Sequence, residues 1–295
     1  MIIITREILL YTCIMRFLRR SNIVTFPNSL LGQDNLLEAL RKDTSSSLSF
    51  PVGKDGDGNY VYTDFQKYAY IIAAGETGSG ISAFRDTMLV SLMHKNTPNE
   101  LKFILIGSKR ESLLKYQNSP YLRFPVTTGT KEFKNTLSWL KQEVIRRLDI
   151  LTGANLSNVY QYNSKHKKKI NTILVVIDEI DELALIHDTF LEETFIWLMQ
   201  RSVAVGINCL ISTDHISDKN FSGMILANSF VRIAFRLPTK KESESLIFES
   251  GAENLKGYGD LLFSTLALPA VRLQVPYISD ESLMRVIEYT SKNRL

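Results

Sequence analysis

Cysteine is scarce in this sequence of 295 residues, and neither glycine nor proline is abundant. The two cysteines, Cys13 and Cys209, lie too far apart for a disulfide framework or a metal knuckle of ordinary spacing. With 15 Gly and 8 Pro beside 44% hydrophobic residues, the composition excludes collagen-like repeats and argues against intrinsic disorder. The sequence therefore predicts a globular, cytoplasmic chain.

Neither sign of charge dominates, and there is no long uninterrupted apolar run. Lys and Arg number 35 against 31 Asp and Glu, a net charge of +4 that is too small for a histone-like binder, so nucleic-acid contacts would need local patches. Residues 2–18 are apolar, but Arg6, Glu7 and Arg16 interrupt them and make a spanning helix costly. We expect an amphipathic helix that docks on the body or on a partner, with peripheral membrane attachment as the alternative.

Short apolar runs alternate with longer helical stretches from residue 68 onward. The runs are continuous and rich in β-branched residues, which is typical of strands buried on both faces of a parallel sheet. Strands are expected at residues 70–74, 101–106, 173–177, 209–212 and 230–235, and helices at 34–42, 83–95, 131–151, 183–203, 241–250 and 280–293. A β-hairpin is expected at 51–62. The alternation predicts an α/β three-layer domain with a mostly parallel central sheet.

A glycine-rich loop follows the run at 70–74 and leads into a helix, the context that a phosphate-binding P-loop requires. Glycines let consecutive amides turn inward around a phosphate at the start of a helix. Ser82 keeps the hydroxyl that would bind magnesium, but Ile81 replaces the lysine that contacts the β and γ phosphates. We expect weak nucleotide affinity and turnover; a tight turn without ligand is the alternative. The candidate binding residues are Gly75, Glu76, Thr77, Gly78, Ser79, Gly80, Ile81 and Ser82.

An acidic pair ends the run at 173–177. Asp178 would hold magnesium and Glu179 would orient the attacking water, although such acids can also cap a helix. The run at 209–212 leads into Thr213, where a sensor of the γ phosphate is expected, and then into Asp214 and His215. A carboxylate near a triphosphate is repulsive. The site has lost one cation, and Asp214 would add an anion.

Several further blocks resemble the motor domain of the FtsK/SpoIIIE DNA translocases from about residue 48 to residue 293. The most specific are residues 225–228, 232–235, 251–255 and 257–262. The resemblance implies a RecA-like P-loop NTPase domain at 48–295, preceded at 1–47 by a helical remnant of the small domain before the motor. It also implies ATP and Mg²⁺ as cofactors, weak or vestigial here, with double-stranded DNA and a hexameric ring as partners.

The resemblance makes Arg232 a candidate finger that acts on the nucleotide of a neighbouring subunit; a salt bridge beside a strand end is the alternative. Besides Ile81, the chain departs from the family at Gly107-Ser108, where the family has Asp-Pro, and at Asp214-His215, where it has Gln-Arg. The winged-helix module and the membrane segment of such translocases are not expected here.

The leading interpretation is a degenerate FtsK/SpoIIIE-type motor subunit with weakened or lost ATP hydrolysis. One alternative is an active DNA-dependent ATPase in which Lys54 or Lys109 supplies the missing cation. Another is a degenerate ATPase component of a secretion or conjugation machine, which would have a membrane-associated partner. Residues 165–169, Lys240 and Lys241 are candidate DNA contacts, although for the run 165–169 a solvated surface loop is the favoured alternative.

Overall fold

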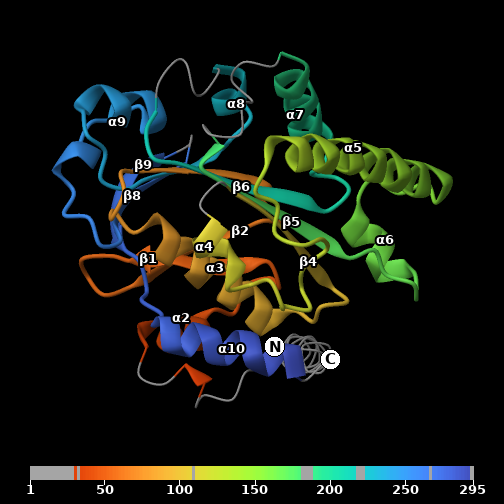
Figure 1. Ribbon diagram of the computed structural model, residues 1–295, viewed down its shortest axis with the longest axis horizontal. Helices are drawn as coiled ribbons and strands as arrows, with labels where there is room; N and C mark the ends of the chain where they lie inside the picture. Colours follow the sequence, from red (N-terminus) through yellow and green to blue (C-terminus); the bar gives the residue numbers. More distant parts are fainter. Residues whose placement is uncertain are drawn as a thin grey trace, which may run out of the picture.

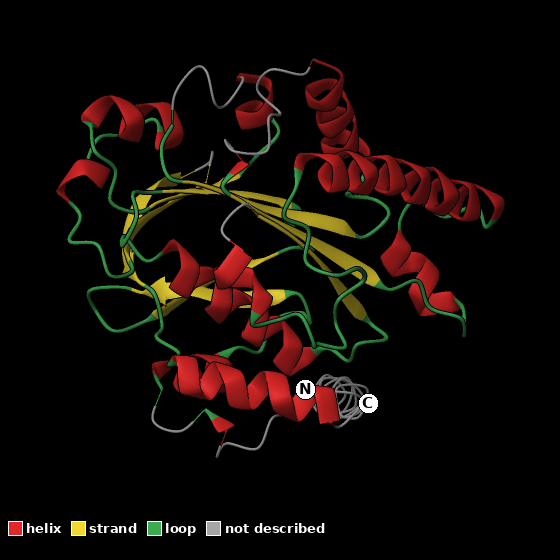
Figure 2. Cartoon of the chain, in the orientation of Figure 1, coloured by secondary structure: helices red, strands yellow, loops and turns green. Residues whose placement is uncertain are grey.

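A nine-stranded sheet runs through the computed structural model, which describes residues 30–31, 34–107, 110–180, 189–216, 223–265 and 268–292. Figure 1 and Figure 2 show helices against both faces of this curved sheet. The strand order is β2-β1-β9-β8-β7-β3-β6-β5-β4. The strands are β1 (Ser49–Lys54), β2 (Tyr60–Asp64), β3 (Tyr70–Ala74), β4 (Leu101–Gly107), β5 (Thr172–Asp178), β6 (Ile207–Thr213), β7 (Val231–Ala234), β8 (Asp260–Thr265) and β9 (Leu268–Gln274).

Five adjacent strands, β7-β3-β6-β5-β4, are parallel. Their side chains serve two cores in alternation, since Ile71 and Ala73 belong to one and Ile72 and Ala74 to the other. Burial on both faces explains why these strands read as continuous apolar runs. The predicted α/β layered fold is confirmed, and the parallel strands place their carboxyl ends at one edge of the sheet.

The other four strands make the sheet mixed rather than mostly parallel. The predicted hairpin is formed by β1 and β2, and Asp55 Oδ1 accepts from the amides of Asp57 and Asn59 in its turn. The sequence did not predict β8 and β9, which pair antiparallel with each other and extend the sheet from β7. Most side chains of β9 are exposed, whereas those of the central strands β3 and β5 are all buried.

Most helices lie where the sequence predicts them. They are α2 (Asn35–Lys42), α3 (Ile81–Lys95), α4 (Arg110–Leu114), α5 (Thr130–Gly153), α6 (Val159–Lys165), α7 (Thr189–Arg201), α8 (Gly223–Ala227), α9 (Lys240–Ile247) and α10 (Asp280–Lys292). Helices α4, α6 and α8 were not predicted. The first residues of the helix expected at 183–203 lie outside the described residues. So does the N-terminal segment 1–29. In the described part of the chain no helix has both the length and the apolar character to cross a membrane.

Helix α3 is buried on almost every side beneath the parallel strands. Phe84, near its start, lies with its ring centroid 6.1 Å from that of Phe50 and 5.9 Å from that of Phe235. Burying one such ring contributes about 1.5–3 kcal/mol. The first turn of α3, which leaves the glycine-rich loop, is therefore held firmly against the sheet. The division of the chain near residue 47 stays a prediction. Helix α2, which precedes it, contacts the strands that follow it, since the Tyr62 hydroxyl on β2 donates to the Ala39 carbonyl at 2.9 Å.

Candidate nucleotide site

A cavity of about 480 Å³ lies at the carboxyl edge of β3, β5 and β6. Ligands of open α/β sheets bind at this edge, just beyond the ends of the strands. The cavity is lined by residues 75–83, Ser112, Asp178, Glu179, residues 212–214, Tyr258 and Tyr277. The structure thus brings the glycine-rich loop, the acidic pair and the expected sensor strand together. Tyr258 and Tyr277 are exposed side chains of this cavity that the sequence analysis gave no role.

The glycine-rich loop has the backbone of an anion-binding turn. Gly78 and Gly80 have φ angles of +84° and +113°, a region that favours glycine. Helix α3 begins at Ile81, so the amides of its first turn have no acceptor within the helix. Ser79 Oγ is buried beside them and has no hydrogen-bond partner among the described residues. A phosphate oxygen would satisfy these donors, so the backbone fits a phosphate group.

A second loop, residues 257–259, supports the first. The Gly259 amide donates to the Ser79 carbonyl at 2.7 Å, and the Tyr258 amide donates to the Gly78 carbonyl at 3.3 Å. A Cβ atom on Gly80 would lie 2.3 Å from the Gly259 nitrogen, so only glycine fits there. The sequence analysis quoted residues 257–262 as a family block without a role; their role here is to hold the phosphate loop.

Position 81 brings no charge to the cavity. Ile81 lines it and packs against one of the two hydrophobic cores. Of the compensating lysines considered from the sequence, Lys54 and Lys109, only Lys54 is among the described residues. Lys54 lies 3.6 Å from Glu38 and does not line the cavity.

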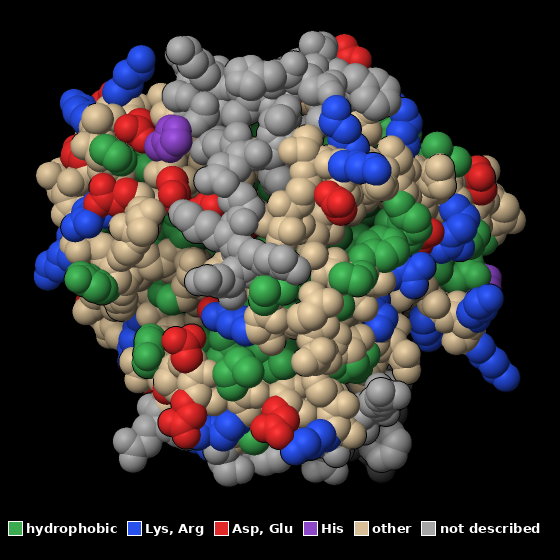
Figure 3. All heavy atoms as spheres, viewed as in Figure 1, with side chains coloured by type: hydrophobic (Ala, Val, Ile, Leu, Met, Phe, Trp, Pro, Cys, Tyr) green, Lys and Arg blue, Asp and Glu red, His purple; other side chains and the backbone are tan. Residues whose placement is uncertain are grey.

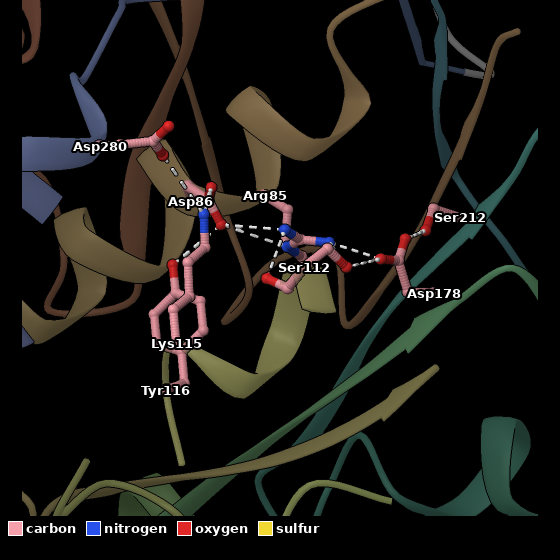
Figure 4. A network of polar contacts seen from close by, with 8 residues as sticks. All are labelled: Arg85, Asp86, Ser112, Lys115, Tyr116, Asp178, Ser212 and Asp280. Carbon is pink, nitrogen blue, oxygen red and sulfur yellow. Dashed lines mark hydrogen bonds and ion pairs between the residues drawn. The ribbon is translucent and has the colours of Figure 1, made fainter. Parts of the chain in front are cut away.

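An arginine that the sequence analysis missed does reach the acidic pair. Arg85 lies one turn after Ile81 on α3, and its Nη1 donates to Asp178 Oδ2 at 2.5 Å (Figure 4). Its side chain is 1% exposed. Ser212 on β6 donates to the other carboxylate oxygen, Oδ1, at 2.6 Å. The signal in the sequence was a charged residue four positions after Ile81, on the same face of the helix.

The guanidinium of Arg85 is also held from its other side. Its Nε and Nη2 both donate to Asp86 Oδ1 at 3.2 Å, and Asp86 binds Lys115 Nζ at 2.5 Å and the Tyr116 hydroxyl at 2.9 Å. Burial alone would lower the pKa of Arg85, but the charges of Asp86 and Asp178 outweigh it and raise this pKa above its ordinary value. Arg85 is therefore a permanent buried cation. Lys115 continues the chain of charges to Asp280, 3.8 Å away on α10 (Figure 4).

Magnesium fits these residues poorly. Ser82 lines the cavity and is free to be a ligand, but the Asp178 carboxylate already faces a guanidinium and a hydroxyl. In the described part of the chain no cluster of three or more His, Cys, Asp or Glu side chains could hold a metal ion. The metal roles given to Ser82 and Asp178 stay predictions, and for Asp178 the role requires Arg85 to leave.

Three further carboxylates border the cavity: Glu76, Glu179 and Asp214. Glu179 follows Asp178 with a φ of +58°, a strained conformation for a residue with a side chain that costs about 1–3 kcal/mol. Asp214 Oδ2 accepts from Thr77 Oγ1 at 3.3 Å, which joins the sensor strand to the glycine-rich loop. Glu76 of the same loop forms an ion pair with Arg236. The expected extra anion, Asp214, thus lies in the cavity.

The side chain of Arg232 is buried within the chain and is not exposed at its surface. The residue is 2% exposed, and Nη1 and Nη2 donate to the carbonyls of Leu246 and Leu226 at 2.9 and 2.7 Å. The ring of Phe248 lies 4.5 Å from its Cζ. The side chain ties β7 to α8 and α9. The finger role of Arg232 therefore stays a prediction that requires the side chain to leave these carbonyls.

The candidate DNA contacts do not form one surface. Residues 165–169 follow α6, whereas Lys240 and Lys241 begin α9 on the opposite flank of the molecule (Figure 1). On the face drawn in Figure 3, Lys and Arg side chains are interspersed with Asp and Glu. The DNA-contact roles stay predictions.

Comparisons with known proteins give one family. A family model described as the FtsK/SpoIIIE family matches residues 33–250. The DNA translocase FtsK of Caldanaerobacter subterraneus subsp. tengcongensis is 34% identical over 250 residues, covering 84% of this chain and 35% of that protein. The DNA translocase FtsK of Haemophilus influenzae is 30% identical over 275 residues, covering 84% of this chain and 52% of that protein. The chain thus spans about a third to a half of the length of these relatives.

Solved structures share the fold at lower identity. The pCW3 conjugation coupling protein TcpA, in its monomer form with ATPγS, has a TM-score of 0.73 at 24% identity and covers 90% of this chain and 73% of its own. The cytoplasmic domain of the type VII secretion ATPase EccC of Thermomonospora curvata has a TM-score of 0.74 at 19% identity, covering 93% of this chain and 33% of its own. These likenesses support the RecA-like fold and nothing further.

Proposed function

Because the chain belongs to the FtsK/SpoIIIE family, we propose that it is a motor-domain subunit that binds nucleotide weakly and has lost most or all ATP hydrolysis. The observation that carries this proposal is the pairing of Ile81 with Arg85. At position 81 the P-loop has no lysine, and four residues later a buried arginine occupies the Asp178 carboxylate.

The phosphate-binding backbone supports retained nucleotide binding. The first-turn amides of α3 and the unpaired Ser79 hydroxyl offer donors to a phosphate, and the cavity volume of about 480 Å³ lies within the range of small-molecule sites. The altered charges support weakness, because no lysine contacts the β and γ phosphates and Asp214 lies nearby. This chain's own residues provide the amide cradle and position the acidic pair.

Double-stranded DNA is the proposed substrate of the assembly, and an oligomeric ring is the proposed form. The support is sequence identity of 30–34% to proteins named DNA translocase FtsK, against 19–24% to the conjugation coupling protein TcpA and the secretion ATPase EccC. We therefore favour a DNA-handling role over a secretion role. With a net charge of +4 and mixed surface charge, DNA contacts in such a ring would be local and sensitive to salt. A hexamer and a membrane-associated partner belong to the same proposal.

The proposed function is tested by nucleotide affinity and by ATP turnover with and without duplex DNA. The natural chain is compared with Ile81→Lys, and Ile145→Lys serves as the matched control because Ile145 is exposed on α5, away from the cavity. We expect Ile81→Lys to bind ATPγS about tenfold more tightly, as one restored charge-assisted contact of about 1.4 kcal/mol implies, and the control to behave as the natural chain. Brisk DNA-stimulated hydrolysis by the natural chain would refute the proposal.

A further inference from the structure

The guanidinium of Arg85 occupies the position beside Asp178 Oδ2 that a bound magnesium ion would need. Its Nη1 lies 2.5 Å from Asp178 Oδ2, and the Ser112 hydroxyl lies 3.5 Å from the same oxygen (Figure 4). Magnesium binds carboxylate oxygens at about 2.0–2.1 Å with nearly octahedral geometry. A guanidinium nitrogen at 2.5 Å fills that space. Its positive charge would also repel the ion.

The guanidinium cannot easily turn aside. Asp86 accepts from two of its nitrogens, and the Ser112 carbonyl accepts from Nη2 at 3.2 Å. Asp86 is itself fixed by Lys115 and by the Tyr116 hydroxyl. With the side chain 1% exposed, leaving Asp178 would strand a buried charge.

Both oxygens of the Asp178 carboxylate also have hydrogen-bond partners. Oδ2 accepts from Arg85 and Oδ1 accepts from Ser212 at 2.6 Å, so each oxygen has a close donor that a metal would have to displace or share. Asp178 is 8% exposed, and little water can replace these partners.

We propose that Arg85 is a built-in counter-ion of Asp178 that takes the place of magnesium, so that nucleotide binding by this chain is independent of magnesium. The inference rests on the proposed weak nucleotide binding and deepens it. Two residues of α3 act together: Ile81 brings no cation to the loop, and Arg85 supplies a fixed cation at Asp178. Restoring the lysine alone therefore does not restore the metal site.

The test measures ATPγS affinity by calorimetry, once with Mg²⁺ and once with EDTA, for the natural chain, Ile81→Lys and Ile81→Lys/Arg85→Met. For the natural chain, the affinity with Mg²⁺ is expected to lie within about twofold of the affinity with EDTA. The same is expected for Ile81→Lys, although its affinity in both conditions is higher than that of the natural chain. The double variant is expected to bind at least about tenfold more tightly with Mg²⁺. Mn²⁺ in place of Mg²⁺ gives a second readout, because its spin resonance reports the bound ion directly.

The matched control is Ile81→Lys/Lys115→Met. It removes one partly buried cation of the same network, but Lys115 contacts Asp86 and Asp280 and not Asp178. It is expected to show no magnesium dependence. Since loss of Arg85 destabilises the fold, Ile81→Lys/Arg85→Gln is prepared as well; glutamine removes the charge but can still donate to the Ser112 carbonyl. Melting curves establish that each variant is folded.

The outcomes separate the two proposals. Magnesium dependence in Ile81→Lys alone overturns the counter-ion role of Arg85 while leaving weak binding by the natural chain intact. Equal binding with and without Mg²⁺ in both folded Arg85 variants also overturns it. Brisk hydrolysis by the natural chain overturns the proposed function. Failure of every folded variant to bind ATPγS contradicts both.

Discussion

The backbone of the phosphate loop and the charged side chains around it border one cavity, yet they depart from the P-loop motif to very different degrees. The glycines are retained, and they also hold the fold: Gly80 touches Gly259, and a Cβ on Gly75 would lie 2.4 Å from Phe235 Cβ. The lysine of the motif is replaced by Ile81, and outside the motif Arg85 lies against Asp178. The comparison teaches that groups with a packing role stay in place, whereas side chains that serve only a ligand can change while the fold remains.

Replacing Arg85 should have the largest effect on stability, because this side chain belongs to both the cavity and the interior. Arg85→Met leaves Asp178 without its cation and Asp86 with one partner fewer, and we expect a loss of about 3–5 kcal/mol in the free energy of unfolding. Urea denaturation measures it. Arg146→Met is the control, since Arg146 pairs with Glu143 on an exposed helix face and should cost about 1 kcal/mol or less. A loss of free energy of unfolding as small in Arg85→Met as in Arg146→Met would contradict a stabilising ion pair between Arg85 and Asp178.

The glycine contact under the phosphate loop predicts the next largest effect. Gly80→Ala places a Cβ 2.3 Å from the Gly259 nitrogen at a φ of +113°, and we expect a loss of about 3 kcal/mol in the free energy of unfolding. Gly153→Ala is the matched control at the end of α5, where a Cβ meets nothing within 4 Å. Differential scanning calorimetry should show a lowered melting temperature in the first variant only. A Gly80→Ala protein as stable as the control would show that the glycine serves the ligand alone.

An ion pair far from the cavity sharpens the contrast with a smaller effect. Burial would raise the pKa of Glu143, but hydrogen bonds from Arg146 and Arg147 outweigh it and lower this pKa to about 2, from 4.5. The carboxylate therefore stabilises the fold above pH 4.5, and this contribution is lost as the pH falls toward 2. We expect Glu143→Gln to cost about 1 kcal/mol at pH 7 and progressively less below pH 4.5. A cost that stays constant between pH 7 and pH 3, measured by urea denaturation, would contradict this.

The meeting of the loop, the acidic pair and the sensor strand could be predicted from the sequence. Residues 70–74, 173–177 and 209–212 read as buried parallel strands, and the carboxyl ends of such strands share one edge of the sheet. Strands β8 and β9 could not be predicted in the same way, because β9 is largely exposed and its sequence, LPAVRLQ, is interrupted by Pro269 and Arg272. Their contribution to the site is the turn at 257–259, a tertiary contact with no local sequence signal.

The contact of Arg85 with Asp178 was also beyond the sequence. The two residues are 93 positions apart, and their distance depends on how α3 packs under the sheet. Helix α3 is buried on nearly all sides, so no apolar stripe indicates which face a charged residue occupies. The role of position 81 could be predicted because the P-loop motif assigns it to the phosphate-binding lysine. Position 85 lies outside that motif, so the motif predicts nothing for it. The adjacent charged pair Arg85-Asp86, near the start of a helix that follows the glycine-rich loop, was the available clue.

The most direct test of the central claim is the affinity of the natural chain for ATPγS, measured with Mg²⁺ and again with EDTA. The cavity has kept the backbone donors of a phosphate site, and Arg85 occupies the carboxylate that would hold the metal. We predict weak binding that differs by less than about twofold between the two conditions. Binding that is about tenfold tighter or more with Mg²⁺ would contradict the account.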